Sequence, residues 1–188
     1  MIDKNYDFRK EDALLIIDVQ KDFCKGGALA VPEADEIIPV LNALIDKAVK
    51  TGIKIYASRD WHPADHVSFQ DRNGNWPPHC IQDTEGAQFH PDLQLPENTI
   101  LVTKGVRFDQ DQNSVFDQTG LEKQMDHDGI QRLWVGGLAL DVCVLQSVLD
   151  ALEAGYRVSL IKAATRAVDP EKGKQAINNM VKAGATIL

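Results

Sequence analysis

Short apolar runs recur along the whole chain, separated by longer stretches in which apolar and polar residues mix. Most residues of these runs are Val, Ile, Leu or Ala. Strands that are buried on both faces of a sheet have this composition, because neither face meets water. The pattern therefore predicts six buried strands, at residues 13–17, 53–57, 99–102, 133–135, 158–161 and 185–188.

Four of the intervening stretches carry apolar residues at helical spacing, at residues 35–51, roughly 119–128, 141–154 and 170–183. Gly52 stands where the first should end, and Asp169 before Pro170 is the order expected of an N-cap and first helical residue. Alternating strands and helices favour a parallel sheet with right-handed crossovers. We therefore expect a three-layer α/β fold with a six-stranded, mainly parallel sheet and helices on both faces. For the strand order we assume 3-2-1-4-5-6, which is common in sheets of this type.

One region breaks this alternation. The chain of 188 residues suits a single domain, 1–188, but residues 58–98 hold five prolines and two tryptophans and contain no apolar run. A loop of that length inside a compact domain is usually functional. The sequence therefore marks residues 58–98 as a functional region before any motif is considered.

Composition and charge exclude several classes of protein. The net charge of −8 argues against nucleic-acid binding, which depends on Lys and Arg. No run of about 18 apolar residues is present, so we expect no membrane partner. The polar start MIDKNYDFRKED does not resemble a signal peptide, and three cysteines do not form a disulfide framework. We expect a cytoplasmic protein, and the sequence leaves assembly into a homo-oligomer open.

Reactive side chains collect where the predicted strands end. Asp18, Asp60, Lys104 and Cys143 each follow one of the first four strands. In open α/β sheets ligands bind beyond the carboxyl ends of the strands, near the point where the strand order reverses. With the expected order, strands one and four are neighbours there, so Asp18 and Cys143 should flank the crevice.

Cys143 is the candidate nucleophile. Asp141 is a plausible N-cap, which would put the thiol in a first helical turn, where the helix dipole favours thiolate. Lys104 would lower the thiol pKa further, Asp18 could exchange a proton, and backbone N–H groups could hold an oxyanion. Taken singly, each residue has a structural alternative: a buried cysteine, a helix-capping Asp and a solvated surface Lys. Together at one sheet edge, they favour an acid–thiol–ammonium trio.

A second cluster indicates a metal. The stretch DWHPADH runs from Asp60 to His66, and His79 follows, so three of the five histidines lie within eighteen residues. Carboxylate and imidazole ligands suit one divalent ion, with Zn²⁺ preferred and Fe²⁺ or Mn²⁺ as alternatives. We interpret His90 and His127 as surface residues. Cys24 and Cys80 could be ligands in principle, but without a C-x-x-C spacing we interpret both as small apolar fillers.

Two aromatic residues lie beside these reactive positions. Phe23 and Trp76 stand in loops where a flat ligand could stack against them. Ordinary loop packing explains them equally well.

At this point the sequence resembles a family, the nicotinamidase/pyrazinamidase branch of the isochorismatase-like hydrolases. The stretches that carry the resemblance are IIDVQKDFCKGGALAVP, SRDWHPADHVSF, WPPHCIQDTEGAQFHP, TKG and GLALDVCV, in family order. The resemblance covers nearly the whole chain and implies deamidation of nicotinamide to nicotinate and ammonia, within NAD salvage.

The resemblance also implies roles for individual residues. Asp18, Lys104 and Cys143 would form the catalytic triad, and Asp60, His62 and His79 would bind the metal. His66 matches a fourth ligand found only in some members. A cis peptide bond is implied at residues 138–139, with the N–H groups of Ala139 and Cys143 in the oxyanion hole. The aromatic amide would lie between Phe23 and Trp76.

The chain departs from the family pattern around the expected pocket. Leu140 and Val142 stand where many relatives have Thr and Tyr, and Asn113 falls where the family's Ser-Tyr-Ser-x-Phe stretch has Tyr. These changes concern the ring substrate rather than the triad or the metal motif.

Three rival functions remain at this stage. A related amidohydrolase could act on an acyclic carbamoyl or ureido compound, although the histidine cluster argues against it. A phospho-receiver domain would need an acidic pair after the first strand and a Lys-Pro, but the chain has a single Asp18 and Lys104 before Gly. A nucleotide-binding module would need a G-x-G-x-x-G after the first strand, and none is present.

Overall fold

The centre of the molecule is a strand that is completely buried. In the computed structural model, which describes residues 6–188, β1 (Asp12–Ile17) has no exposed residue. It pairs in parallel with β2 (Lys54–Asp60) on one side and with β4 (Arg132–Leu138) on the other. A strand with neighbours on both edges and helices on both faces meets no water, which is why its sequence DALLII contains no polar residue after Asp12.

The sheet confirms the expected topology. Six parallel strands lie in the order β3-β2-β1-β4-β5-β6, with β3 (Ile100–Lys104) and β6 (Thr186–Ile187) at the two edges and β5 (Arg157–Arg166) beside β4. The strand order reverses between β1 and β4, so a crevice is expected beyond their carboxyl ends.

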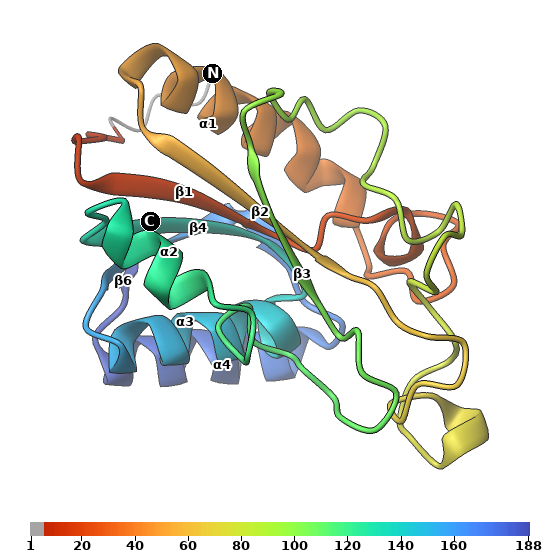
Figure 1. Ribbon diagram of the computed structural model, residues 1–188. Helices are drawn as coiled ribbons and strands as arrows, with labels where there is room; N and C mark the ends of the chain where they lie inside the picture. Colours follow the sequence, from red (N-terminus) through yellow and green to blue (C-terminus); the bar gives the residue numbers. More distant parts are fainter. Residues whose placement is uncertain (1–5) are drawn as a thin grey trace.

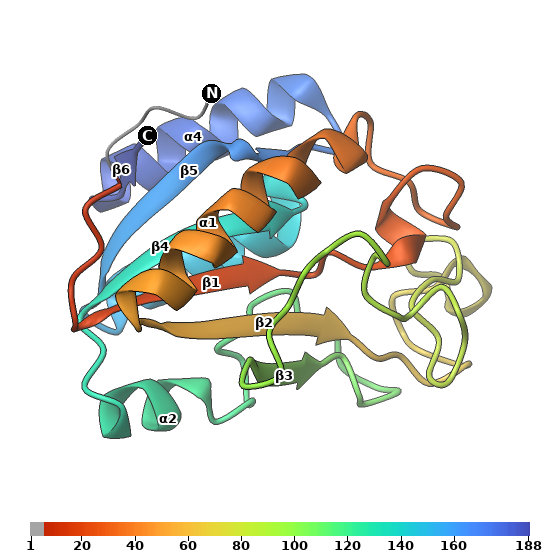
Figure 2. The ribbon, with the colours of Figure 1, turned by 90° about the horizontal axis from the view of Figure 1, so that it is seen from above.

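Helices cover both faces of the sheet (Figures 1 and 2). Helix α1 (Ile38–Thr51) packs its buried residues, among them Leu41 and Leu44, into one hydrophobic core. On the other face lie α2 (Leu121–His127), α3 (Leu145–Glu153) and α4 (Pro170–Ala183), whose buried side chains form a second core. The two cores and the sheet between them make the expected three layers.

The helix ends follow the sequence signals. Gly52 ends α1 with a left-handed conformation, φ +72°, and its N–H donates to the carbonyls of Ala48 and Val49. Asp169 caps α4, with its side chain accepting from the N–H groups of Glu171 and Lys172. Both predicted boundaries are confirmed.

The predicted helix at residues 141–154 is wrong in its first turn. Residues Leu140–Val144 form a π-helical turn, and α3 begins only at Leu145. Asp141 is not its N-cap. Its carboxylate instead accepts from the N–H groups of Val168, at 2.9 Å, and Asp169, at 3.0 Å, which ties this turn to the start of α4.

Residues 58–98 contain little regular structure, as expected. After β2 ends at Asp60, this region includes a 3-10 turn at Gln70–Arg72 and isolated bridges such as Gln20 with Phe89. Most of its loops lie beyond the carboxyl ends of the strands, at the right of Figure 1, before the chain returns across the top to the start of β3. Within residues 6–188, no helix is both long enough and apolar enough to cross a membrane.

Candidate active site

The register of two strands places a carboxylate beside an ammonium. Asp60 is the last residue of β2 and Lys104 the last of β3, and the two are direct cross-strand partners. Both therefore lie inside their strands, whereas the sequence placed them just after. The Nζ atom of Lys104 is 2.6 Å from Oδ1 of Asp60 and 2.8 Å from Oδ2 of Asp18. One buried ammonium thus holds two buried carboxylates.

Lys104 is fully charged in this setting. Its side chain has no exposed surface. Burial alone would lower the pKa of Lys104, but Asp18 and Asp60 outweigh it and hold that pKa well above its ordinary value. The solvated surface Lys considered as the alternative is therefore excluded.

Asp18 occupies an unusual backbone position directly after β1. Its φ is +49°, in the left-handed region that a non-glycine residue seldom adopts. Its Oδ1 accepts a hydrogen bond from Oγ of Ser58 at 2.7 Å. Burial raises the pKa of Asp18, although Lys104 acts in the opposite direction. A carboxylate with few hydrogen bonds and a raised pKa is suited to accept and return a proton.

Cys143 is the third residue that the Lys104 ammonium contacts, after Asp18 and Asp60. Its Sγ is 3.5 Å from Nζ of Lys104, and the residue is 6% exposed. The structure thus brings Asp18, Lys104 and Cys143 together, as the sequence predicted. Ligand atoms of Asp18, Asp60 and Cys143 lie within 4.8 Å of one another, but the Lys104 ammonium contacts all three residues and takes the place of a cation there.

Of the two predicted causes of thiol activation, the helix start is wrong, whereas Lys104 does act to lower the pKa of Cys143. We expected a helix start and Lys104 to lower the pKa of Cys143. Burial instead raises this pKa well above its ordinary value, and Lys104 offsets it only in part. The thiol precedes α3 in a π-helical turn rather than occupying its first turn. Cys143 therefore rests as a thiol, and its proton must pass to a neighbouring base during the reaction.

Two histidines point one ring nitrogen each toward Asp60. Ligand atoms of Asp60, His62 and His79 lie within 4.8 Å of one another. Nδ1 of His62 is 2.9 Å from the Gly105 carbonyl oxygen, and Nδ1 of His79 is 2.8 Å from that of Pro77. A carbonyl at Nδ1 fixes the proton there and leaves Nε2 as an acceptor, the usual arrangement around a metal-binding histidine. These three residues fit a divalent metal ion.

His66 lies beside this group without completing it. Its ring stacks on that of His62 with the centroids 4.0 Å apart. Its Nδ1 is 2.7 Å from Oγ of Ser68, and its Nε2 is 3.1 Å from the Gln110 carbonyl oxygen. Both ring nitrogens have partners, so this geometry supports a metal group of three residues rather than four.

A cavity joins the thiol to the histidine group. Its lining includes Cys143 and Ala139, the pair predicted for the oxyanion hole, and both predicted aromatic residues, Phe23 and Trp76. The peptide bond between Leu138 and Ala139 is cis, as the resemblance implied. Remaining wall residues come from distant segments: Leu29, Val31, Asp60, His62, Ser68, His79, Asp111, Asn113, Val142 and Val168. Asn113 and Val142 thus lie at the pocket, whereas Leu140 packs into the core behind it.

The sequence reasoning missed three buried polar residues that position the site. Ser58 donates to Asp18, as described above. Gln20 accepts from the N–H of Asp60 at 2.8 Å and donates to the carbonyl of Asp60 at 2.7 Å. Gln112 accepts from the N–H of Gly105 at 3.0 Å, so it steadies the carbonyl that holds His62. Of these three, only Gln20 could have been suspected from the sequence, because it stands two residues after Asp18.

Comparison with known proteins agrees with this geometry. The chain matches the isochorismatase domain over residues 12–188. The nicotinamidase of Escherichia coli (strain K12) is 41% identical, over 93% of each chain. A pyrazinamidase of Pyrococcus horikoshii, solved in complex with zinc, superposes with a TM-score of 0.92 at 41% identity and covers 95% of this chain and 98% of its own. PnC1 of L. infantum, solved with nicotinate, gives 0.88 at 34% identity, with 95% and 92% covered.

Proposed function

This chain belongs to the isochorismatase family, and we propose that it is a nicotinamidase, which hydrolyses nicotinamide to nicotinate and ammonia in NAD salvage. The observation that carries the proposal is the buried Lys104, which contacts Asp18, Asp60 and Cys143 at once. Cys143 opens onto the same cavity as the histidine group. The nicotinamidase of Escherichia coli and the nicotinate-bound relative support this substrate.

The first half of the reaction uses the proton of Cys143. Asp18, whose pKa is raised by burial, accepts the thiol proton as sulfur attacks the carboxamide carbon. The N–H groups of Ala139 and Cys143 hold the negative oxygen of the tetrahedral adduct. Asp18 returns the proton to the leaving nitrogen, so that ammonia departs and a thioester to Cys143 remains.

The second half reverses these roles. Asp18 takes a proton from water, and the resulting hydroxide adds to the thioester carbon. Collapse of this adduct expels the sulfur, which regains its proton from Asp18. The product leaves as nicotinic acid, which ionises to nicotinate in water. Lys104 keeps its positive charge throughout and stabilises the negative charge that moves between Asp18 and Cys143.

Asp60, His62 and His79 would hold the metal. We propose Zn²⁺, with Fe²⁺ or Mn²⁺ as alternatives, because carboxylate and imidazole donors suit these ions. Bound there, the ion would supply a Lewis-acidic position for the ring nitrogen of the substrate. His62 and His79 are already oriented for this by the carbonyls at their Nδ1 atoms.

The pocket walls suit a small flat amide. Phe23 and Trp76 offer aromatic faces, and Val142 and Val168 add apolar surface. All three cysteines are free thiols, which agrees with a cytoplasmic location. Assembly into a homo-oligomer stays a prediction.

Ammonia release from nicotinamide tests the proposal. We expect turnover by the zinc-loaded protein, none by Cys143→Ala, and a nicotinoyl adduct on Cys143 detectable by mass spectrometry after rapid acid quenching. A panel of acyclic carbamoyl and ureido compounds runs beside it. Turnover on that panel with none on nicotinamide would favour the related amidohydrolase. Near-normal turnover by Cys143→Ala, together with its loss in His62→Ala, would instead assign the attack to metal-bound hydroxide.

A further inference from the structure

A second group of possible metal donors lies outside the active site. Ligand atoms of Cys24, Asp35 and His90 are within 4.8 Å of one another. None of the three lines the catalytic cavity. Cys24 is buried and the other two are partly exposed, so the group lies just below the surface. The sequence-based interpretation of Cys24 as a filler and of His90 as a surface residue is therefore incomplete.

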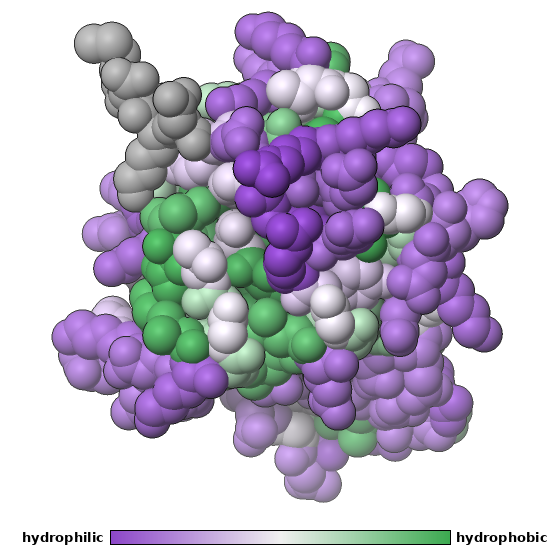
Figure 3. Space-filling model, turned by 90° about the vertical axis from the view of Figure 1, so that its left-hand side faces the viewer, coloured by the Kyte–Doolittle hydropathy of each residue, from purple (hydrophilic) through white to green (hydrophobic). Residues whose placement is uncertain are grey.

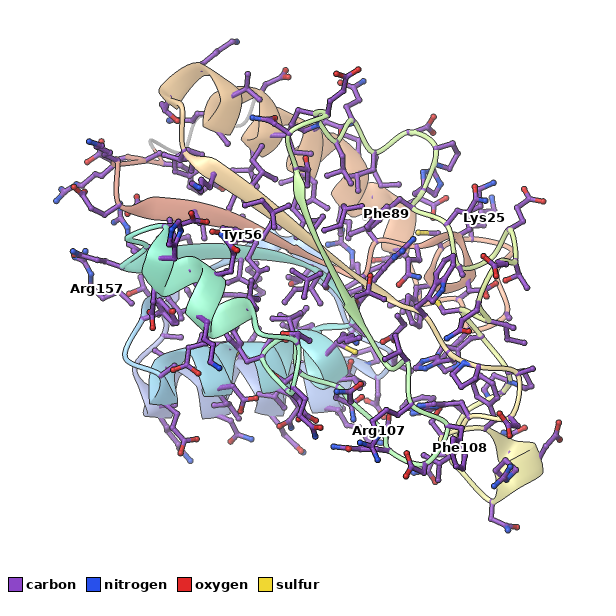
Figure 4. All side chains as sticks on the ribbon, viewed as in Figure 1. Lys25, Tyr56, Phe89, Arg107, Phe108 and Arg157 are labelled. Carbon is purple, nitrogen blue, oxygen red and sulfur yellow. The ribbon has the colours of Figure 1, made fainter. Side chains whose placement is uncertain are left out.

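Hydrogen bonds fix three separate segments at this point, two through the backbone and one through the Asp35 side chain. The N–H of Cys24 donates to the Lys21 carbonyl at 3.0 Å, and the N–H of His90 donates to that of Val19 at 2.9 Å. Oδ1 of Asp35 accepts from the N–H of Lys25 at 2.9 Å. Figure 4 shows Lys25 and Phe89, the chain neighbours of Cys24 and His90, among the loops beyond the carboxyl ends of the strands. The donors are therefore held together before any ligand arrives.

We propose that Cys24, Asp35 and His90 form a second metal site, which binds a borderline-soft divalent cation, Zn²⁺ by preference. One thiolate, one imidazole and one carboxylate are donors that zinc accepts, and three protein ligands leave a fourth position for water. An open hollow lined by Cys24, Lys25, Gly27, Glu85 and His90 provides that access. This site differs from the catalytic group, whose three donors include no sulfur.

Charge balance favours zinc despite lysines at the rim. Thiolate and carboxylate together neutralise the two positive charges of the ion, so the complex carries no net charge beside Lys21 and Lys25. Lys21 is moreover paired with Glu85, with Nζ 2.7 Å from Oε1. The rim therefore adds little repulsion against a bound cation.

Binding must release a proton from the thiol. Burial and the nearby Asp35 raise the pKa of Cys24 to about 12, so the metal-free residue is a thiol. A metal bound to the sulfur takes the place of this proton, so one proton leaves the thiol on binding.

Such an ion would brace one wall of the catalytic cavity. Phe23 precedes Cys24 directly, and Val31 lies between Cys24 and Asp35 in the chain, and both line the cavity. A metal bound to Cys24 and His90 would join this wall to the 82–98 loop. Its expected contribution is to stability, since none of its ligands faces the thiol of Cys143.

The direct test is metal content after loading with zinc and removal of loosely bound ions. We expect about two zinc ions per chain for the unaltered protein and about one for Cys24→Ser or His90→Gln. His127→Gln is the matched control, because this histidine has a side chain that is 84% exposed. It should keep about two. The same zinc content in the unaltered protein and in Cys24→Ser would overturn the proposal.

Cobalt substitution provides a second readout, because a thiolate ligand gives an absorption band that is seen in the unaltered protein itself. A thiolate-to-cobalt charge-transfer band should appear in the unaltered protein, persist in Cys143→Ala and vanish in Cys24→Ser. Loss of the band in Cys143→Ala alone would place the sulfur ligand at the catalytic centre and overturn the second site. Both experiments are independent of turnover, so a failure of the nicotinamidase proposal would not affect them.

Discussion

Strand β1 begins with one buried aspartate, Asp12, and is followed directly by another, Asp18. The pKa values of these two carboxyl groups are shifted in opposite directions. Asp12 is 1% exposed and Asp18 is 0% exposed. Burial acts to raise the pKa of both, yet the pKa of Asp12 is lowered and that of Asp18 is raised. The difference lies in the donors around each group.

Asp12 is surrounded by hydrogen-bond donors at the amino ends of the strands. It accepts from the N–H of Arg9 at 2.8 Å, from Nε1 of Trp134 at 2.9 Å and from two nitrogens of Arg132. Asp18 has only the Ser58 hydroxyl and an ammonium that it shares with Asp60. A carboxylate that accepts many hydrogen bonds stabilises a fold, whereas one with few hydrogen-bond donors around it can exchange protons.

The two ends of the sheet differ in the same way on a larger scale. At the amino ends, polar side chains surround a patch of apolar ones (Figure 3). The carboxyl ends instead carry the loops, the histidines and the cavity. Stability and chemistry are thus assigned to opposite ends of the same strands, and the following variants test this division.

The largest effect on turnover is expected from Asp18→Asn. Loss of the proton acceptor should reduce kcat/KM about 10⁴-fold. The free energy of unfolding should change little or rise, because a buried carboxylate with a raised pKa is replaced by a neutral group and Lys104 keeps Asp60. Steady-state kinetics and urea unfolding measure the two quantities. Retention of a tenth of the activity would show that Asp18 is not the proton carrier.

A smaller loss is expected from Gly105→Ala. An added Cβ would lie 2.4 Å from Cε1 and 2.6 Å from Nδ1 of His62, so the imidazole must move. Zinc affinity at the catalytic site should fall about 10- to 100-fold, as measured by competition with a chelator. Gly129→Ala is the matched control, since its φ of +70° is close to the +66° of Gly105 and its Cβ meets open space. Equal losses in both variants would mean that backbone strain alone is responsible.

The smallest effect is expected from Asp12→Asn, and it concerns stability. At pH 7 the variant should lose about 1–2 kcal/mol of unfolding free energy with kcat unchanged. The pKa of Asp12 lies below its ordinary 3.8 in the folded state, so its contribution is complete above that pH and disappears as the pH falls through the folded value. Unfolding at pH 7, 5 and 3 should therefore show the two proteins converging only at the lowest pH. If the two unfolding free energies differed by the same amount at every pH, the loss of stability would not be caused by the charge of Asp12.

Several features of the fold could be predicted because their causes are local. The run DALLII and the order of Asp169 and Pro170 determine their elements through burial and capping alone. The start of α3 could not be predicted, because Asp141 binds the N–H groups of Val168 and Asp169, far along the chain. Periodicity does not reveal such a partner.

The candidate site also has parts that could be predicted from the sequence and parts that could not. Strand ends and motifs located Asp18, Lys104, Cys143 and the histidines. The direct pairing of Asp60 with Lys104, and the support that Gln112 gives to Gly105, follow from register and loop packing. The His90 side chain was interpreted as a surface residue because its neighbours Cys24 and Asp35 are more than fifty residues away in the chain.

By itself the sequence determined which residue types stand at the carboxyl ends of the strands, and so which chemistry is available. Only the tertiary structure decided the protonation state of each group. A pKa depends on burial and on the donors within a few ångströms, and segments far apart in the chain supply both. Cys143 therefore rests as a buried thiol, Lys104 stays charged, and Asp18 is left as the group that can accept the proton of Cys143 and pass it on.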